Sequence, residues 1–177
     1  MARSILPRLA ALLLLAPLLL MAACRSSAAA SVPPGHGVVD AVVDGDTIVV
    51  RVGGHREHVR LLGIDTPETV DPRKPVACFG PQASAATKHL LTPGTAVRLE
   101  RDTEARDVYG RLLAYVYRES DGLFVNLELA KQGYADVLAI SPNLTHADQF
   151  RAAVDDARAT ARGLWAACSA FGVPATG

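Results

Sequence analysis

The sequence predicts an α+β protein in which a small five-stranded β-barrel is accompanied by three helices. Two observations support this prediction. Short runs of β-branched residues alternate with turn residues across the first two thirds of the folded region, a pattern typical of small barrels. Apolar residues then recur at spacings of three and four towards the C-terminus, which indicates an amphipathic helix.

The first three predicted strands form a continuous series of hairpins. Residues 38–43 and 47–52 are β-branched runs, and Asp44-Gly45-Asp46 between them is a sharp turn signal. Gly53-Gly54 then forms a second turn that leads into the strand predicted over 58–64.

Two further strands complete the predicted barrel. Residues 95–101 alternate, with Val97 and Leu99 on one side and Arg98 and Glu100 on the other. The last strand covers 112–117 and is closed by the turn residues at 119–122.

Three helices are predicted between and after these strands. The first covers 81–91 and ends before Pro93-Gly94, and the second covers 125–132 and ends at Gly133. The third ends at Gly163 and carries one apolar stripe, formed by Phe150, Ala153, Val154, Ala157, Ala161 and Leu164.

The N-terminal region carries the features of an export signal. Arg3 and Arg8 precede an apolar stretch at 9–20 that is too short to cross a bilayer comfortably. Residues 1–23 are therefore predicted to be a signal peptide. Cys24 follows two alanines, as in a bacterial lipoprotein box, so Cys24 is the predicted lipidation site. The alternative is an ordinary signal peptide that precedes a cysteine by chance.

The remaining chain divides into three segments. Residues 24–37 are small, polar and rich in proline and glycine, which indicates a flexible tether. The folded domain is predicted over 38–168, long enough to bury a core, and 169–177 form a C-terminal tail.

The charge balance excludes a strongly basic protein. The chain has 18 basic and 18 acidic residues, and the chain after residue 23 keeps 16 basic and 18 acidic ones, a net charge of −2. Non-specific nucleic-acid binding depends on Lys and Arg at phosphates. A local cluster of basic residues in the middle of the chain must therefore supply any such binding.

Cys78 and Cys168 are candidate disulfide partners. Apart from Cys24 they are the remaining cysteines of a chain predicted to be exported, and paired thiols are common outside the cytoplasm. The alternative is that both are unpaired small apolar residues.

Three acids and two arginines form the candidate chemical site. Asp46, Asp65 and Glu68 lie beside turn residues at the ends of predicted strands, and Arg60 and Arg111 accompany them. Hard carboxylate oxygens bind divalent cations, and guanidinium groups bind phosphate oxygens bidentately. This combination is suited to holding a divalent cation against a phosphodiester.

Four motifs in this order resemble the staphylococcal nuclease (thermonuclease) family. They are DGDT from Asp44, RLLGIDTPET from Arg60, FGPQAS from Phe79 and YGRLLAY from Tyr109. The resemblance implies a five-stranded OB-fold barrel with three helices. It also implies a Ca²⁺-dependent endonuclease that cuts DNA and RNA with little sequence preference and leaves 3′-phosphates.

The resemblance also implies a role for each matching residue. The calcium ligands fall on Asp46, Asp65 and the carbonyl of Thr66, and the proposed general base falls on Glu68. Arg60 and Arg111 match the phosphate-binding arginines, and Tyr109 matches a residue of the loop that holds a nucleotide phosphate.

Three positions depart from the family pattern. Val108 replaces a lysine that meets phosphate, and Leu138 and Ile140 replace two tyrosines near the nucleotide. An aliphatic side chain cannot stack as a ring does, so these changes affect nucleotide affinity and base preference. Ser141-Pro142 matches a family position known for a cis proline.

Two alternatives to a nuclease remain open on the sequence alone. One is a non-catalytic OB-type module that binds nucleic acid or a protein. The other is a surface lipoprotein whose aspartates bind Ca²⁺ for structural reasons, which leaves Arg60 and Arg111 without a role. The expected protein is monomeric, exported and either secreted or anchored to a membrane through a lipid at Cys24.

Overall fold

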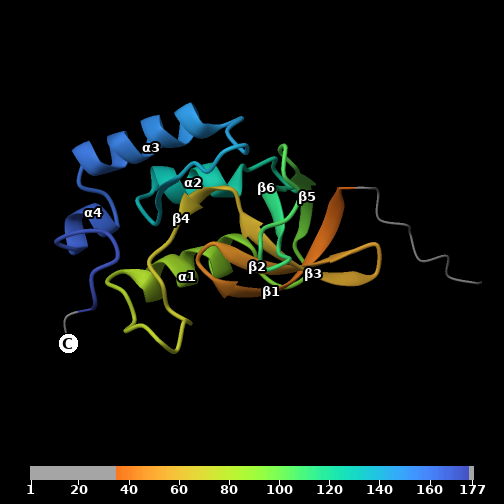
Figure 1. The fold of residues 1–177 in the computed structure, drawn as a ribbon, viewed down its shortest axis with the longest axis horizontal. Helices are drawn as coiled ribbons and strands as arrows, with labels where there is room; N and C mark the ends of the chain where they lie inside the picture. Colours follow the sequence, from red (N-terminus) through yellow and green to blue (C-terminus); the bar gives the residue numbers. More distant parts are fainter. Residues whose placement is uncertain (1–34, 176–177) are drawn as a thin grey trace, which may run out of the picture. The chain divides into compact units, whose positions relative to one another are not determined.

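The computed structural model describes residues 35–175. The predicted signal peptide, Cys24 and most of the predicted tether lie outside these residues. Within them, five strands close into a barrel in the order β1-β2-β3-β6-β5 (Figure 1). The strands are β1 His36–Asp44, β2 Thr47–Val52, β3 His55–Leu61, β5 Ala96–Glu100 and β6 Leu112–Arg118.

The register of the barrel follows from its turns. Gly45 and Asp46 connect β1 to β2, so that Asp44 pairs with Thr47, and Gly53-Gly54 connect β2 to β3. The barrel closes through β3 and β6, which run parallel, with Arg60 opposite Leu113. The closed mixed barrel and its helices confirm the predicted OB-fold α+β architecture.

The predicted helices are present with small shifts at their ends. They are α1 Gly80–Leu90, α2 Val125–Lys131 and α3 Ala147–Ala159. The predicted stripe is buried at Phe150, Ala153, Val154 and Ala157. The prediction that this helix runs to Gly163 was wrong: α3 ends at Ala159, Ala161 is exposed with a φ of +49°, and Leu164 is buried but belongs to the next helix. A short helix, α4 Leu164–Ala167, follows, and the guanidinium of Arg158 lies 4.1 Å from the centre of the Trp165 ring. Within residues 35–175, no helix is both long and apolar enough to cross a membrane.

The strand predicted over 58–64 is broken at Leu62. Gly63 has a φ of +82°, a conformation that favours glycine, and the chain turns there to begin β4 Gly63–Asp65. β4 leaves the barrel and pairs with β7 Asp136–Leu138, a strand that the sequence pattern did not predict. This turn brings Asp65 beside the end of β2.

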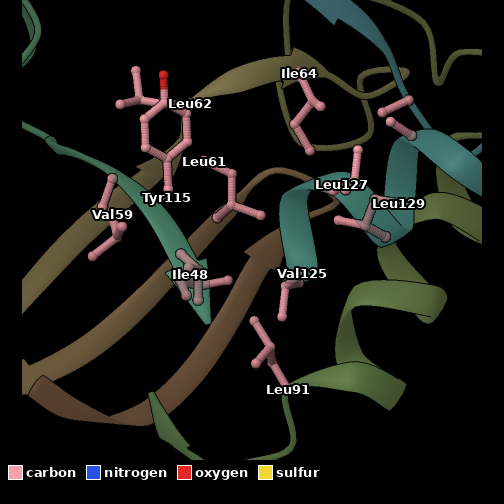
Figure 2. Packing of buried hydrophobic residues seen from close by; sticks show 14 of the residues in the cluster. Ile48, Val59, Leu61, Leu62, Ile64, Leu91, Tyr115, Val125, Leu127 and Leu129 are labelled. Atoms are coloured by element: carbon pink, nitrogen blue, oxygen red, sulfur yellow. The ribbon is translucent and has the colours of Figure 1, made fainter. Parts of the chain in front are cut away.

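The core fills the barrel and extends beneath the helices (Figure 2). Ile48, Val59 and Leu61 are fully buried in the barrel, and Val125 and Leu129 of α2 pack against the same cluster. α2 contacts β6, α1 and α3. Burial of this apolar surface is the main stabilising contribution, and it fixes the strand ends that carry polar residues.

The predicted disulfide between Cys78 and Cys168 is confirmed. The two Cα atoms lie 6.0 Å apart, and 90 residues separate the cysteines in sequence. The chain-entropy model gives a loop of this size a stabilisation of about 4–5 kcal/mol. The bridge joins the segment before α1 to the segment after α4.

Gly63→Ala is predicted to destabilise the protein more than Gly54→Ala does. Both glycines have a positive φ, +82° and +86°, but a methyl group at Gly63 would overlap the Phe150 ring whereas one at Gly54 would meet no atom within 4 Å. The backbone cost of alanine in this region is about 1–2 kcal/mol at each site, and overpacking at Gly63 adds about 1–3 kcal/mol. Chemical denaturation of the two variants measures the loss in the free energy of unfolding that each substitution causes. Equal losses in the two variants would contradict the role of Phe150.

Candidate active site

A cleft of about 890 Å³ opens where β1 ends and β2 begins, beside the ends of β3 and β4. The loop at 66–79 and the loop at 101–111 contribute residues to its walls. Every side chain that the sequence predicts for binding or catalysis lines this one cleft: Asp46, Arg60, Asp65, Thr66, Glu68, Tyr109 and Arg111.

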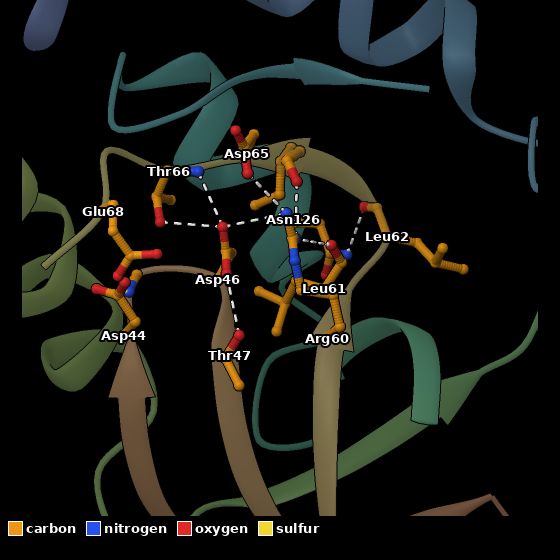
Figure 3. A network of polar contacts seen from close by, with 12 residues as sticks. Asp44, Asp46, Thr47, Arg60, Leu61, Leu62, Asp65, Thr66, Glu68 and Asn126 are labelled. Atoms are coloured by element: carbon orange, nitrogen blue, oxygen red, sulfur yellow. Dashed lines mark hydrogen bonds and ion pairs between the residues drawn. The ribbon is translucent and has the colours of Figure 1, made fainter. Parts of the chain in front are cut away.

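Asp46 is buried at the floor of the cleft (Figure 3). Its Oδ2 accepts hydrogen bonds from the backbone N–H of Thr66 at 2.9 Å and from the Thr66 hydroxyl at 3.1 Å. Its Oδ1 accepts a bond from the Thr47 hydroxyl at 3.0 Å, and Oδ2 lies 3.2 Å from Arg60 Nη2. These contacts hold the carboxylate in one orientation.

Arg60 is fixed by the turn between β3 and β4. Its Nη1 donates to the carbonyls of Leu61 at 2.7 Å and Ile64 at 2.8 Å, which converge because the chain turns at Leu62 and Gly63. Its Nη2 donates to Asp65 Oδ1 at 2.8 Å. Asp46 and Asp65 therefore share one guanidinium nitrogen, which brings the two predicted ligands together.

Asp65 is the more open of the two aspartates. Its side chain keeps 39% of its surface exposed, against 11% for Asp46. Burial raises the pKa of Asp65, the Arg60 charge opposes the shift, and the nearby carboxylates of Asp46, Glu68 and Asp136 add to it. A cation between the aspartates would relieve this repulsion.

Glu68 lies on the loop that follows β4. Its Oε1 accepts three backbone N–H bonds, from Thr69 at 2.9 Å, Val70 at 2.8 Å and Asp71 at 3.1 Å. Burial opposes ionisation of Glu68, but the hydrogen bonds from these backbone N–H groups hold its pKa below the ordinary value. The carboxylate is thus ionised, and the loop backbone sets its position.

Asp44 also belongs to the site, although the sequence analysis interpreted it as a turn residue. It is buried, and its Oδ1 accepts bonds from the Gly45 N–H at 2.8 Å and the Thr69 hydroxyl at 2.5 Å. Burial raises its pKa, against the bonds from Thr69 and Gly45, and the charges of Asp46 and Glu68 add to the shift. The sequence signal that could have identified Asp44 as a site residue is its position in the Asp44-Gly45-Asp46 stretch, two residues before Asp46.

Arg111 also lines the cleft, at the end of the loop at 101–111. Asp107 accepts bonds from both the Nε of Arg111 at 2.7 Å and its backbone N–H at 2.9 Å. Nη1 makes a long contact of 3.4 Å with the Thr47 hydroxyl. Asp107 thereby orients the side chain from its base and leaves the terminal nitrogens available. The Tyr109 ring, centred 5.5 Å from the Arg111 Cζ, is 81% exposed.

The rim of the cleft is apolar where the family pattern has polar or aromatic residues. Val108, Leu138 and Ile140 line it and are exposed, Val108 to 93%. The Ser141-Pro142 peptide bond is cis. The cleft thus combines a charged floor with an aliphatic rim.

The charged side chains that line the cleft include more acids than bases. Three arginines, Arg60, Arg106 and Arg111, face six carboxylates, a formal net charge of −3. The acids are Asp44, Asp46, Asp65, Glu68, Glu104 and Asp107. Within residues 35–175, no group of three or more His, Cys, Asp or Glu side chains has an arrangement that could hold a metal ion. A cation here would need backbone or solvent oxygens beside the Asp46 and Asp65 carboxylates.

Comparison with known proteins agrees with this geometry. A family model described as staphylococcal nuclease homologue matches residues 58–167. Thermonuclease from Staphylococcus intermedius is 46% identical over 125 residues, covering 71% of this chain and 70% of that protein. Thermonuclease from Staphylococcus hyicus is 40% identical over 124 residues, covering 70% and 72%. Endonuclease YncB from Bacillus subtilis (strain 168) is 42% identical over 129 residues, covering 72% and 60%.

The matched region contains Arg60, Asp65, Glu68 and Arg111, and the barrel around them is the one that the motifs predict. The chain belongs to the staphylococcal nuclease family.

Proposed function

We propose that this chain is a Ca²⁺-dependent endonuclease that hydrolyses phosphodiester bonds of DNA and RNA with little sequence specificity and leaves 3′-phosphates. Its relatives are named thermonuclease and endonuclease, which supports nuclease activity. The observation that carries the proposal is the pairing of Asp46 and Asp65 on one nitrogen of Arg60, with Arg111 lining the same cleft.

The charge of the cleft supports a requirement for a divalent cation. A phosphodiester would enter a site of formal net charge −3, and like charges repel strongly where water is excluded. Asp46, Asp65 and the carbonyl of Thr66 offer the hard oxygen donors that Ca²⁺ prefers. When bound, the cation would supply positive charge to the phosphate oxygens and acidify a water molecule.

The two arginines are positioned to stabilise the charge that develops on the phosphate. Arg111 is bonded to Asp107 through Nε and its backbone N–H, so its terminal nitrogens can donate to phosphate oxygens. Arg60 must release Asp65 in part to do the same, because its Nη2 is bonded to that carboxylate. Removing such preorganised donors typically costs several orders of magnitude in rate.

Glu68 is proposed to orient or deprotonate the attacking water. One of its carboxylate oxygens is occupied by three backbone N–H groups, and the other has no bond of this kind. The same bonds keep the group ionised, so it can accept a hydrogen bond or a proton.

A non-catalytic OB-type module that binds nucleic acid or a protein is the alternative function. The acidic cleft opposes a module that only binds nucleic acid, because a polyanion-binding surface gains nothing from six acids in its cleft. A hydrolysis assay distinguishes the two: cleavage of DNA or RNA excludes the non-catalytic module.

We also propose that the protein is exported as a monomer and is anchored to a membrane through a lipid on Cys24. The proposal rests on the charged and apolar segments before Cys24 and on the tether after it. The confirmed disulfide supports export, because disulfides persist in oxidising compartments.

Arg111→Ala is predicted to lower kcat for DNA hydrolysis in Ca²⁺ by about 10³-fold, because it removes a transition-state charge stabiliser. Arg98→Ala is the matched control, since Arg98 pairs with Glu100 on β5 outside the cleft. The kcat of Arg98→Ala should stay within about threefold of the wild-type value, as expected for a substitution on the surface. Full activity in Arg111→Ala, or in wild type with excess chelator, would contradict the proposed mechanism.

Leu138→Tyr is predicted to strengthen inhibition by a nucleoside 3′,5′-bisphosphate by about 1–3 kcal/mol, because a ring restores stacking at the rim. Leu144→Tyr is the control, since Leu144 is similarly exposed but does not line the cleft. Inhibition constants measure the effect. An unchanged constant for Leu138→Tyr would place the nucleotide base elsewhere.

The mature N-terminus is predicted to be a lipid-modified Cys24. Mass spectrometry of the membrane fraction should find the acylated peptide, and Cys24→Ser should release the protein from the membrane. Freely secreted wild-type protein with an unmodified N-terminus would refute the anchor.

A further inference from the structure

The segment at 66–79 has no helix or strand of its own, although it carries Glu68. Its middle part is mostly exposed, Val70 and Val76 included, so burial does little to fix residues 70–76. Glu68 depends on this segment, because the three N–H groups that hold its carboxylate belong to Thr69, Val70 and Asp71. The position of Glu68 therefore follows the conformation of the loop.

The C-terminal tail lies against this loop and is joined to it by two backbone hydrogen bonds. Cys78 donates its N–H to the Val173 carbonyl at 2.7 Å, and Ala175 donates to the Val76 carbonyl at 2.9 Å. Ala77 and Pro174 form an antiparallel bridge between these bonds. The Cys78–Cys168 disulfide attaches the tail covalently at the same place.

A short chain of contacts leads from this attachment to Glu68. Ala77, next to Cys78, is buried and donates its N–H to the Glu68 carbonyl at 2.9 Å. Gly80 lies so close to the loop that a methyl group there would come within 2.6 Å of Thr69 Cγ2 and 3.1 Å of the Glu68 carbonyl. Backbone hydrogen bonds and the peptide bond between Ala77 and Cys78 thus link the tail to Glu68.

We propose that the Cys78–Cys168 disulfide positions Glu68, so that hydrolysis by this enzyme depends on the bridge being oxidised; this rests on the proposed nuclease function. Without the bridge, the tail keeps two backbone hydrogen bonds to the loop, and between α4 and residue 175 it forms no helix or strand. Such segments open readily. Cys78 and Cys168 are positioning residues, since they act through the loop.

A dithiol reduces the Cys78–Cys168 disulfide by thiol–disulfide exchange. A dithiol supplies two electrons and two protons, its thiolate attacks one sulfur of the bridge, and its second thiol closes a ring. The S–S bond between Cys78 and Cys168 breaks, two protein thiols form, and the dithiol becomes a cyclic disulfide. The barrel strands hold one another through their own ladders and core, so the effect should stay local.

Hydrogen exchange of the protein without substrate tests the structural part. In dithiothreitol, the amides of Thr69, Val70 and Asp71 should exchange about tenfold faster or more, as expected for a locally opened segment. Amides of the barrel strands, such as Ile48 and Val59, should keep their protection. Unchanged protection at Thr69–Asp71 would overturn the proposal, whatever the activity.

Kinetics test the link to Glu68. The double variant Cys78→Ser/Cys168→Ser should lose about tenfold in kcat with little change in KM, since misplacing a catalytic group by about 1 Å can cost up to 10²-fold. In a Glu68→Gln background, loss of the bridge should cause no further decrease, because residues that act as one unit are not additive. Equal losses in both backgrounds would overturn the proposal.

A core variant controls for general loss of stability. Val97→Ala in β5 removes fully buried methyl groups away from the cleft and should lower Tm without changing kcat at a temperature where the protein is folded. A matching loss of kcat in Val97→Ala would show that stability alone is responsible. If oxidised wild type hydrolyses no nucleic acid, the proposed function fails, and hydrogen exchange still decides the positioning role.

Discussion

The buried ion pair between Asp46 and Arg60 is the interaction on which the site depends. Each side chain is only 11% exposed, and a buried charge destabilises a protein unless it is paired and hydrogen-bonded. The structure meets this requirement with the hydroxyls of Thr47 and Thr66 for Asp46 and with two carbonyls for Arg60. Those carbonyls converge because the chain turns at Gly63. The turn by which the chain leaves the barrel therefore also sets the geometry of the site.

The same network explains why the cleft carries an excess of negative charge. Arg60 is shared between Asp46 and Asp65, and Arg111 is held by Asp107, so both arginines are balanced before a substrate arrives. Asp44 and Glu68 add further carboxylates beside Thr69. In the proposed enzyme a divalent cation would offset part of this excess. The disulfide and the tail fix the loop that completes the cleft.

Sequence patterns predicted the elements whose burial is periodic. The β-branched barrel strands and the apolar stripe of α3 were identified for that reason. β7 is three residues long and has no fully buried residue, so it carries no such pattern. The break at Leu62 was also missed, because glycine at position 63 does not reveal the sign of its φ. The motifs located Arg60 and Asp65, but the pairing of Arg111 with Asp107 and the role of Asp44 depend on contacts that only the folded chain defines.

Calorimetric titration with a nucleoside 3′,5′-bisphosphate, with Ca²⁺ and with chelator, tests most directly whether the acidic cleft needs a divalent cation before it can hold phosphate. Ca²⁺ should tighten binding by about tenfold or more, equivalent to at least about 1.4 kcal/mol, and Asp65→Asn should reduce this difference. Equal affinity with and without Ca²⁺ would contradict this requirement, because the carboxylates of Asp46 and Asp65 would then have no cation to bind at the phosphate.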